Sequence, residues 1–149
     1  MIKCWIDGCC EPVNPGGTAG YGVSVQRDGL QLWEESRIVG SGPKMSNNVA
    51  EYSGLLSLLQ FLLKSGLNEE QIMVYSDSKL VIEQTWGKPK WKMRQGLYIP
   101  IAKQCREYLA VFPNITGTWI PREQNEEADR LSKAALKSRG VKFKLQPEK

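Results

Sequence analysis

An apolar stretch from Val49 to about Lys64 constrains the fold of this chain more than any other feature. Its apolar residues recur at spacings of three and four, which is typical of an α-helix with one buried face: Val49, Tyr52, Leu55, Leu56, Leu59, Leu62 and Leu63. Asn47 or Asn48, just before this stretch, is suited to cap the helix. Glu51 is unusual, because it shares a helix row with three leucines. An acid near a helix start also complements the helix dipole, so Glu51 alone identifies no site.

Three strands are predicted before this helix. In Met1–Gly8 apolar residues alternate with others, which is the period of a strand, and the strand ends at an aspartate, Asp7. Tyr21–Gln26 and Leu30–Val39 alternate in the same way on the two sides of an Asp-Gly hairpin signal. Cys9–Gly20 holds two prolines and three glycines, which indicates an irregular loop. We expect the three strands to form an antiparallel unit.

A second aspartate follows a strand later in the chain. Ile72–Tyr75 is a short apolar strand that comes after a helix, the arrangement that makes a strand parallel to an earlier one. Asp77 follows this strand and precedes a predicted helix at Lys79–Trp86, which Asp77 could also simply cap. In open sheets, binding sites form at the carboxyl ends of parallel strands. Asp7 and Asp77 both lie at such ends, so the pair indicates a site at this edge of the sheet.

The last third of the chain adds a strand between two helices. A helix is predicted from Arg94 to about Val111, although Pro100 indicates either a later start or a kink. Phe112–Thr116 is predicted to turn and Gly117–Ile120 to form a fifth strand. A loop then enters a final helix, whose apolar row is Ala128, Leu131, Ala135 and Leu136.

A fourth acid, Asp129, flanks the apolar row of that final helix, as Glu51 flanks its own. Asp129 could instead belong to a solvated face, on which Glu126 pairs with Arg130 one turn later. Beyond this helix, Gly140–Lys149 is short, polar and basic, and we expect it to fray.

Composition narrows the class of protein. A length of 149 residues fits one domain, and 41% apolar with 24% charged residues is ordinary for a soluble globular protein. The net charge of +4 permits a polyanionic partner without requiring one. Gly87–Arg94 carries four basic residues around Trp91, which suits phosphate contacts and base stacking. A solvated loop with a packed tryptophan explains the same stretch equally well.

The cysteines do not point to zinc or to disulfides. The four cysteines show no CxxC spacing, and the chain has no histidine. We therefore expect a reduced chain in the cytoplasm. The start lacks the features of a signal peptide, and no apolar run approaches the roughly 18 residues of a membrane span.

Four motifs, in order and at matching distances, resemble type 1 ribonuclease H. They are Asp7-Gly8 with a following Asn-Pro-Gly-Gly, Ser46–Tyr52, Tyr75–Ser78 and Trp119–Asp129. The chain looks most like the short subgroup of archaea and some bacteria, which lacks the catalytic-loop histidine and the long basic protrusion. The resemblance implies an α/β, ribonuclease H-like fold, with a five-stranded mixed sheet of order 3-2-1-4-5 flanked by helices. Residues 1–140 would form this single domain and residues 141–149 a short basic tail.

The same resemblance implies hydrolysis of the RNA strand of RNA–DNA hybrids, with 5′-phosphate and 3′-hydroxyl products. Asp7, Glu51, Asp77 and Asp129 would hold two magnesium ions, for which manganese could substitute. Hard oxygen ligands suit magnesium, and two ions about 3.5–4 Å apart clamp the attacking and leaving oxygens. Arg122 stands near the place of the histidine that longer relatives carry. Because arginine cannot shuttle protons near neutral pH, we expect Arg122 to bind the scissile or departing phosphate.

Substrate contacts are also implied by the resemblance. The amides of Asn14, Asn47 and Asn48 would lie against the minor groove and test for 2′-hydroxyl groups, although Asn47 and Asn48 could only cap the helix. The other expected contacts are main-chain groups near the first aspartate and a set of basic and aromatic side chains: Gly8, Cys9, Lys79, Lys90, Trp91 and Lys92. These contacts do not read the identity of the bases, so we expect cleavage to be largely independent of sequence.

Three alternatives stay open. The chain could also cut double-stranded RNA, could bind hybrids without cleaving them, or could be a domain of a reverse transcriptase or another polymerase. The presence of all four acids favours an enzyme. A start at Met1 and an end just after the last helix favour a free-standing enzyme, which we expect to act as a monomer without a membrane partner.

Overall fold

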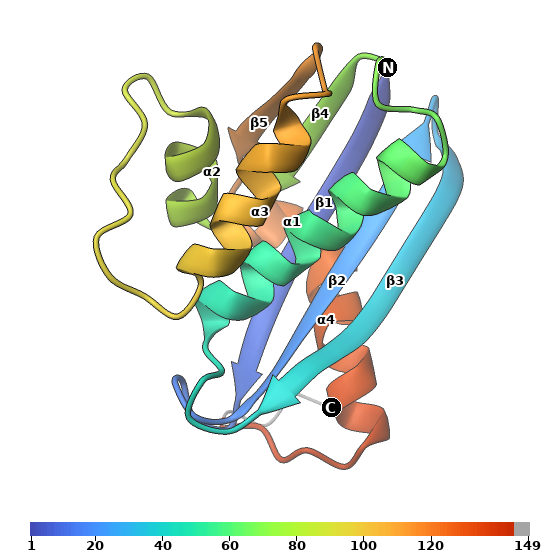
Figure 1. The fold of residues 1–149 in the computed structure, drawn as a ribbon. Helices are drawn as coiled ribbons and strands as arrows, with labels where there is room; N and C mark the ends of the chain where they lie inside the picture. Colours follow the sequence, from blue (N-terminus) through green and yellow to red (C-terminus); the bar gives the residue numbers. More distant parts are fainter. Residues whose placement is uncertain (145–149) are drawn as a thin grey trace.

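A computed structural model describes residues 1–144 of the chain. In this part of the chain five strands form one sheet, in the order β3-β2-β1-β4-β5 (Figure 1). The strands are β1 (Ile2–Glu11), β2 (Thr18–Arg27), β3 (Leu30–Ser41), β4 (Ile72–Ser76) and β5 (Ile115–Trp119). β1, β2 and β3 are antiparallel neighbours, whereas β4 runs parallel to both β1 and β5. The mixed sheet and its predicted strand order are confirmed.

The helices lie on both faces of this sheet. They are α1 (Asn47–Lys64), α2 (Lys79–Trp86), α3 (Ile99–Leu109) and α4 (Glu126–Ser138), with a short 3₁₀ helix at Arg122–Gln124. α1 crosses one face and carries α3 on its side, while α4 packs against β1, β2 and β3 from the opposite face (Figure 1). α2 packs beside β4 and β5.

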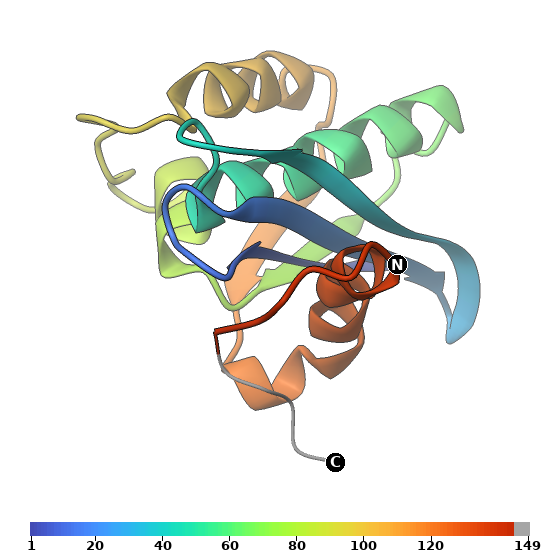
Figure 2. The ribbon, with the colours of Figure 1, turned by 90° about the horizontal axis from the view of Figure 1, so that it is seen from below.

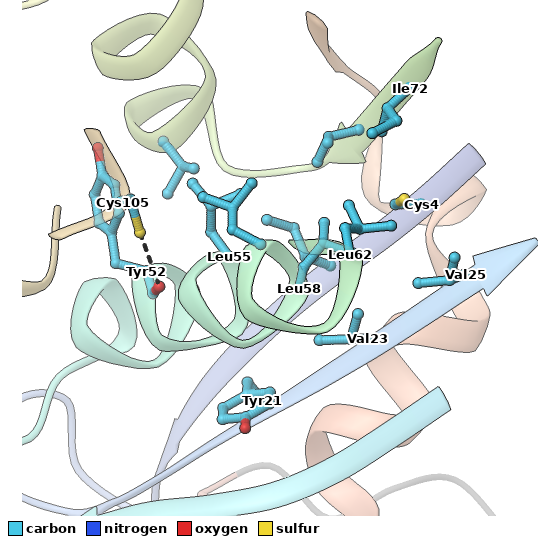
Figure 3. Packing of buried hydrophobic residues seen from close by; sticks show 14 of the residues in the cluster. Cys4, Tyr21, Val23, Val25, Tyr52, Leu55, Leu58, Leu62, Ile72 and Cys105 are labelled. Carbon is cyan, nitrogen blue, oxygen red and sulfur yellow. Dashed lines mark hydrogen bonds between the residues drawn. The ribbon is translucent and has the colours of Figure 1, made fainter. Parts of the chain in front are cut away.

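The main core lies between α1 and the sheet. The inward residues of β1 and β2, among them Cys4, Val23 and Val25, meet the leucine row of α1 (Figure 3). Leu55, Leu58, Leu59 and Leu62 are completely buried there. Two members of the predicted apolar face lie at its margin, since Leu56 is only partly buried and Leu63 is 38% exposed.

The first strand is longer than predicted, and the reason is its hairpin partner. β1 continues through Glu11, because Cys9, Cys10 and Glu11 pair with the start of β2. The prediction of an irregular loop over Cys9–Gly20 is therefore wrong, and only residues 12–17 connect the two strands. The parallel pairing of β1 with β4 nevertheless ends at Ile6 and Ser76. Asp7 and Asp77 are thus the first residues beyond the parallel ladder.

Serines, and not the asparagines or the aspartate, cap the two helices next to the acids. The Ser46 hydroxyl accepts a hydrogen bond from the Val49 N–H at 3.1 Å, so Asn47 and Asn48 are already inside α1. The Ser78 hydroxyl caps α2 in the same way. Asp77 therefore does not cap α2, and capping does not explain an aspartate at this position.

The remaining boundaries shift by a few residues. α3 begins at Ile99 with Pro100 in its first turn, as the later start predicted. β5 begins at Ile115, two residues before the predicted strand, and ends at Trp119. Arg130 pairs with Glu127 rather than with Glu126. Within residues 1–144, no helix is both long enough and apolar enough to cross a membrane.

The chain does not fray directly after α4. The main-chain N–H of Lys144 donates to Glu11 Oε2 at 2.9 Å, which ties residues 141–144 to the end of β1. The rest of the predicted tail, residues 145–149, lies outside the described residues.

Candidate active site

Three acids from separate elements meet at the edge where β1 and β4 part. Asp7 lies within β1, Glu51 in α1, and Asp77 directly after β4. One carboxylate oxygen from each lies within 4.8 Å of the other two. They line an open cavity of about 860 Å³, to which Asp129 of α4 also contributes. All four acids therefore line one cavity, as the sequence analysis expected.

Glu51 reaches the cluster because α1 lies directly on β1. A Cβ atom at Gly8 would stand 2.5 Å from the Glu51 main-chain nitrogen and 2.8 Å from the Ala50 carbonyl carbon. Only glycine permits this approach. Glu51 is consequently 3% exposed, so it is buried beside Asp7 rather than placed at the edge of an apolar face.

Asp129 reaches the cavity because α4 lies equally close to the opposite face. Gly22, the ladder partner of Asp7, faces α4, where a Cβ atom would stand 2.4 Å from the Ala128 carbonyl oxygen. The Asn125 side-chain amide, just before α4, donates to the Ile6 carbonyl oxygen at 2.9 Å. These contacts hold the start of α4 against the end of the β1–β4 ladder.

The charges of the four acids are balanced unequally. Lys133 Nζ lies 3.1 Å from Asp129 Oδ1, and Arg122 Nη2 lies 4.0 Å from the same oxygen. Within residues 1–144, neither Asp7 nor Glu51 pairs with a lysine or arginine in this way. Cationic side chains therefore form ion pairs only on the α4 side of the cluster, although the charge of Arg122 also lowers the pKa of Asp77 in part.

Burial and mutual repulsion disfavour ionisation of the inner acids. Burial raises the pKa of Asp7 to about 8, with further increases from the charges of Asp77 and Asp129. Burial, followed by the charges of Asp7 and Asp77, raises the pKa of Glu51 well above its usual value. Burial also raises the pKa of Asp77.

This donor set fits a hard divalent cation. Glu51 Oε2 is buried and has no hydrogen-bond partner, which is costly for a carboxylate oxygen unless a cation or proton binds it. Clustered carboxylate oxygens are the ligands that magnesium and manganese prefer. The unpartnered oxygen and the repulsion within the cluster are both relieved by a bound cation.

Some of the predicted substrate contacts border the same cavity. Gly8, Cys9, Asn14 and Asn47 line it, and so does Arg122. Asn14 Oδ1 accepts a hydrogen bond from the Asn47 main-chain N–H at 2.9 Å. This bond joins the β1–β2 connection to the start of α1, and the two segments together form one rim of the cavity.

The other predicted contacts lie outside the cavity lining. They are Asn48, Lys79, Lys90, Trp91 and Lys92. Lys79 Nζ stands 5.4 Å from the centre of the Trp119 ring, a cation–π contact. Trp91 is 47% exposed, so it is not the packed tryptophan of the alternative interpretation.

Several cavity-lining residues were not predicted as site residues, among them Trp119, Lys133 and Lys144. The Trp119 indole N–H donates to the Asp77 carbonyl oxygen at 3.1 Å. Lys133 follows Asp129 by one helical turn, and this spacing is the signal that could have identified it. Lys144 had no such signal, because only the path of the chain after α4 brings it to the cavity.

The adjacent cysteines also have a structural explanation. The Cys9 thiol donates to the Ser132 carbonyl oxygen, and the Cys10 thiol donates to the Val13 carbonyl oxygen, each at 3.2 Å. One thiol therefore contacts α4 and the other contacts the β1–β2 connection. Both are free thiols.

Comparison with known proteins agrees with this geometry. The family model described as "Reverse transcriptase-like" matches residues 6–135. "Bifunctional protein Rv2228c" of Mycobacterium tuberculosis is 36% identical over 125 residues, which cover 83% of this chain and 32% of that protein. "Ribonuclease HI" of Halobacterium salinarum is 31% identical over 135 residues, covering 91% of this chain and 64% of that protein. The chain thus spans about a third of the length of the mycobacterial relative.

Solved structures extend the comparison. The N-terminal RNase H domain of Rv2228c is 32% identical, with a TM-score of 0.74, and 89% of this chain covers 97% of that one. LC11-RNase H1, solved in complex with an RNA/DNA hybrid, is 28% identical with a TM-score of 0.83, and 95% of this chain covers all of that chain. From the matched family model, the sheet order and these relatives, the chain belongs to the reverse transcriptase-like family and, within it, to the type 1 ribonucleases H.

Proposed function

We propose that this protein is an endonuclease that hydrolyses the RNA strand of RNA–DNA hybrids and leaves 5′-phosphate and 3′-hydroxyl ends. The observation that carries the proposal is the approach of Asp7, Glu51 and Asp77 within 4.8 Å, with Asp129 in the same cavity. A similar protein, LC11-RNase H1, has been solved with an RNA/DNA hybrid, which supports the choice of substrate. The proposed domain is residues 1–140, with residues 141–144 held against it through Glu11, and it is proposed to act as a monomer.

The four carboxylates would hold two magnesium ions, for which manganese could substitute. When bound, such cations lower the pKa of an attacking water and stabilise the leaving oxygen of the phosphodiester. Asp7 and Glu51 depend most on such a cation, because no lysine or arginine within residues 1–144 forms an ion pair with either. Glu51 Oε2, which is unpartnered, is the clearest ligand position.

Arg122 is proposed to bind a phosphate oxygen of the substrate. Its side chain is 74% exposed and stays 4.0 Å from Asp129, so its guanidinium N–H groups remain available at the mouth of the cavity. A guanidinium donates hydrogen bonds but does not release a proton near neutral pH. Arg122 therefore binds and orients the phosphate and does not act as an acid or a base.

Recognition of the hybrid is proposed to use the rim formed by Asn14 and Asn47, together with main-chain groups at Gly8 and Cys9. Amide groups can both donate to and accept from a 2′-hydroxyl group, which distinguishes RNA from DNA. Contacts farther along the duplex are assigned to side chains outside the cavity: Asn48, Lys79, Lys90, Trp91 and Lys92. These groups meet sugar and phosphate, so cleavage is expected to be largely independent of sequence.

A cleavage assay with three labelled duplexes tests the proposal. RNA–DNA hybrid, double-stranded RNA and double-stranded DNA are each incubated with magnesium, manganese or a chelator. We expect cleavage of the hybrid's RNA strand with either metal and none with the chelator. Cutting of double-stranded RNA as well would broaden the substrate class. Binding of the hybrid without cutting under every condition would contradict an enzyme and leave a hybrid-binding module.

The Asp7→Asn variant tests the assignment of the acids. This substitution keeps the shape of the side chain and removes its charge, so metal binding should fail while hybrid binding in chelator survives. We expect cleavage to fall by at least about 1,000-fold, as is usual when an essential group of a catalytic unit is removed. Glu70→Gln, which changes an acid at the far end of the sheet, is a matched control. Cleavage by Asp7→Asn at the rate of this control would refute the assignment.

A further inference from the structure

The segment that follows α4 is held in place as far as Lys144. It runs back from the end of α4 toward the β1–β2 hairpin (Figure 2). The Val141 N–H donates to the Leu136 carbonyl oxygen at 3.1 Å, and Lys137 Nζ lies 5.9 Å from the centre of the Phe143 ring. The Lys144 N–H then donates to Glu11 Oε2 at 2.9 Å. These contacts fix both ends of the segment.

The result is a lysine at the mouth of the cavity that holds the four acids. Lys144 lines this cavity together with Glu11, Pro12 and Val13, whereas Lys142, two residues earlier and also exposed, does not. Of the three cationic side chains in the lining, Arg122 and Lys133 pair with Asp129. Within residues 1–144, no carboxylate forms an ion pair with the Lys144 ammonium.

An exposed, unpaired ammonium at the rim of the cavity is available to bind an anion. Each nucleotide of a nucleic acid strand brings one phosphate charge, and a lysine binds such a charge as a point contact without reading the base. The hydrogen bond to Glu11 already orders the main chain at Lys144. Binding of a phosphate therefore costs less conformational entropy. The segment is therefore arranged for a backbone contact next to the acids.

We propose that Lys144 binds a backbone phosphate of the hybrid at the rim of the active site, and that Glu11 positions it through the main chain. This inference rests on the proposed function, because it takes the substrate from there. It makes Lys144 a part of the substrate-binding surface, and the segment before it the means by which Lys144 reaches the cavity.

Binding of the hybrid to Lys144→Ala, measured by fluorescence anisotropy in chelator over a range of salt concentrations, tests the inference. Loss of one phosphate contact should weaken binding about three- to tenfold and reduce the slope of log K against log salt by about one. In cleavage assays KM should rise while kcat stays unchanged. Lys142→Ala removes the same charge two residues away and should change affinity less than about twofold. Equal affinities and salt slopes for the two variants would overturn the inference.

A second variant, Glu11→Ala, separates positioning of Lys144 by Glu11 from the effect of the Glu11 charge alone. Glu11→Ala removes a negative charge from the cavity lining, so electrostatics alone predicts tighter binding of a polyanion. If Glu11 positions Lys144, binding should weaken instead, and adding Glu11→Ala to Lys144→Ala should cause no further loss. Tighter binding by Glu11→Ala would exclude the positioning role. If the unaltered protein neither binds nor cuts hybrids, the proposed function itself is wrong. If the unaltered protein cuts hybrids and Lys144→Ala binds them with the same affinity, only this inference is wrong.

Discussion

At the scale of single residues, the acids of the cavity play two different physical roles. Asp7 and Glu51 are buried, and their mutual repulsion makes them depend on a cation or on protons. The side chain of Asp129 is 30% exposed and forms ion pairs with Lys133 and Arg122. Sequence motifs group all four acids together, but only the surroundings of each side chain separate an inner cluster from an outer one.

Arg122→Ala is expected to lower turnover without changing the pH profile. Loss of one charge-assisted hydrogen bond to a phosphate is worth about 1.5–3 kcal/mol, which corresponds to roughly a 10- to 100-fold fall in kcat/KM. The pH profile should keep its shape, because the arginine does not titrate near neutral pH. Cleavage rates from pH 6 to 9 provide the measurement, with Arg139→Ala beyond α4 as the control. A displaced profile would mean that Arg122 or a neighbour takes part in proton transfer.

At the scale of elements, two glycines set how closely the helices approach the sheet. Gly8 allows α1 to lie on one face of β1, and Gly22 allows α4 to lie on the opposite face of β2. Because Glu51 and Asp129 belong to these helices, their distance from Asp7 depends on both contacts. A shift of either helix by the width of a methyl group would open the cluster.

Gly22→Ala should therefore damage both stability and activity. The new methyl group would stand 2.4 Å from the Ala128 carbonyl oxygen and 2.5 Å from the Ser132 nitrogen, so α4 must move away. Overpacking of this kind typically costs about 1–3 kcal/mol. We expect a melting temperature lower by roughly 2–10 °C and a loss of cleavage at temperatures where the variant is still folded.

Gly40→Ala provides the comparison for that variant. Gly40 also lies in a strand, but the nearest atom to its added Cβ would be the flexible Met45 sulfur at 3.3 Å. We expect almost unchanged melting and cleavage. Thermal melts and cleavage rates of the two variants provide the measurement. Equal losses of melting temperature and of cleavage rate in Gly22→Ala and Gly40→Ala would contradict the close-packing argument.

At the scale of the whole molecule, the acidic cavity links stability to pH. In an unfolded chain Asp7, Glu51 and Asp77 ionise near pH 4, whereas folding raises their pKa values, that of Asp7 to about 8. Between about pH 4 and pH 8 the folded chain therefore holds protons that the unfolded chain has lost. This contribution to stability is complete below about pH 4 and disappears as the pH rises through about 8.

The metal-free protein should accordingly melt at a lower temperature as the pH rises from 5 to 8. One unit of raised pKa corresponds to about 1.4 kcal/mol, so a fall of at least about 4 °C is expected. Asp7→Asn should flatten this dependence. Magnesium should stabilise the protein more at pH 8 than at pH 5, because binding then displaces fewer protons. Thermal melts in chelator and in magnesium provide the measurement, and a melting temperature that rises with pH equally in the unaltered protein and in Asp7→Asn would contradict the account.

The sequence by itself determined the types and order of the elements and the residues that carry the chemistry. Hydrophobic periods, turn residues and helix signals are local, so they predicted the sheet strands and the leucine face of α1, and they offered a later start of α3 as one of two effects of Pro100. The four acids were recognisable from short motifs around each of them. Caps and strand ends were less well predicted, because Ser46 competes with Asn47 and Asn48 for the same role and because β1 lengthens only where β2 pairs with it.

Only the tertiary structure decided how these parts meet. The burial of Glu51, the entry of Asp129 into the same cavity and the return of Lys144 to Glu11 all join segments through the packing of α1 and α4 on the sheet. The close contacts at Gly8 and Gly22 set that packing to within the size of a methyl group. Distances of this kind depend on atoms far apart in the chain, and so no local pattern in the sequence contains them.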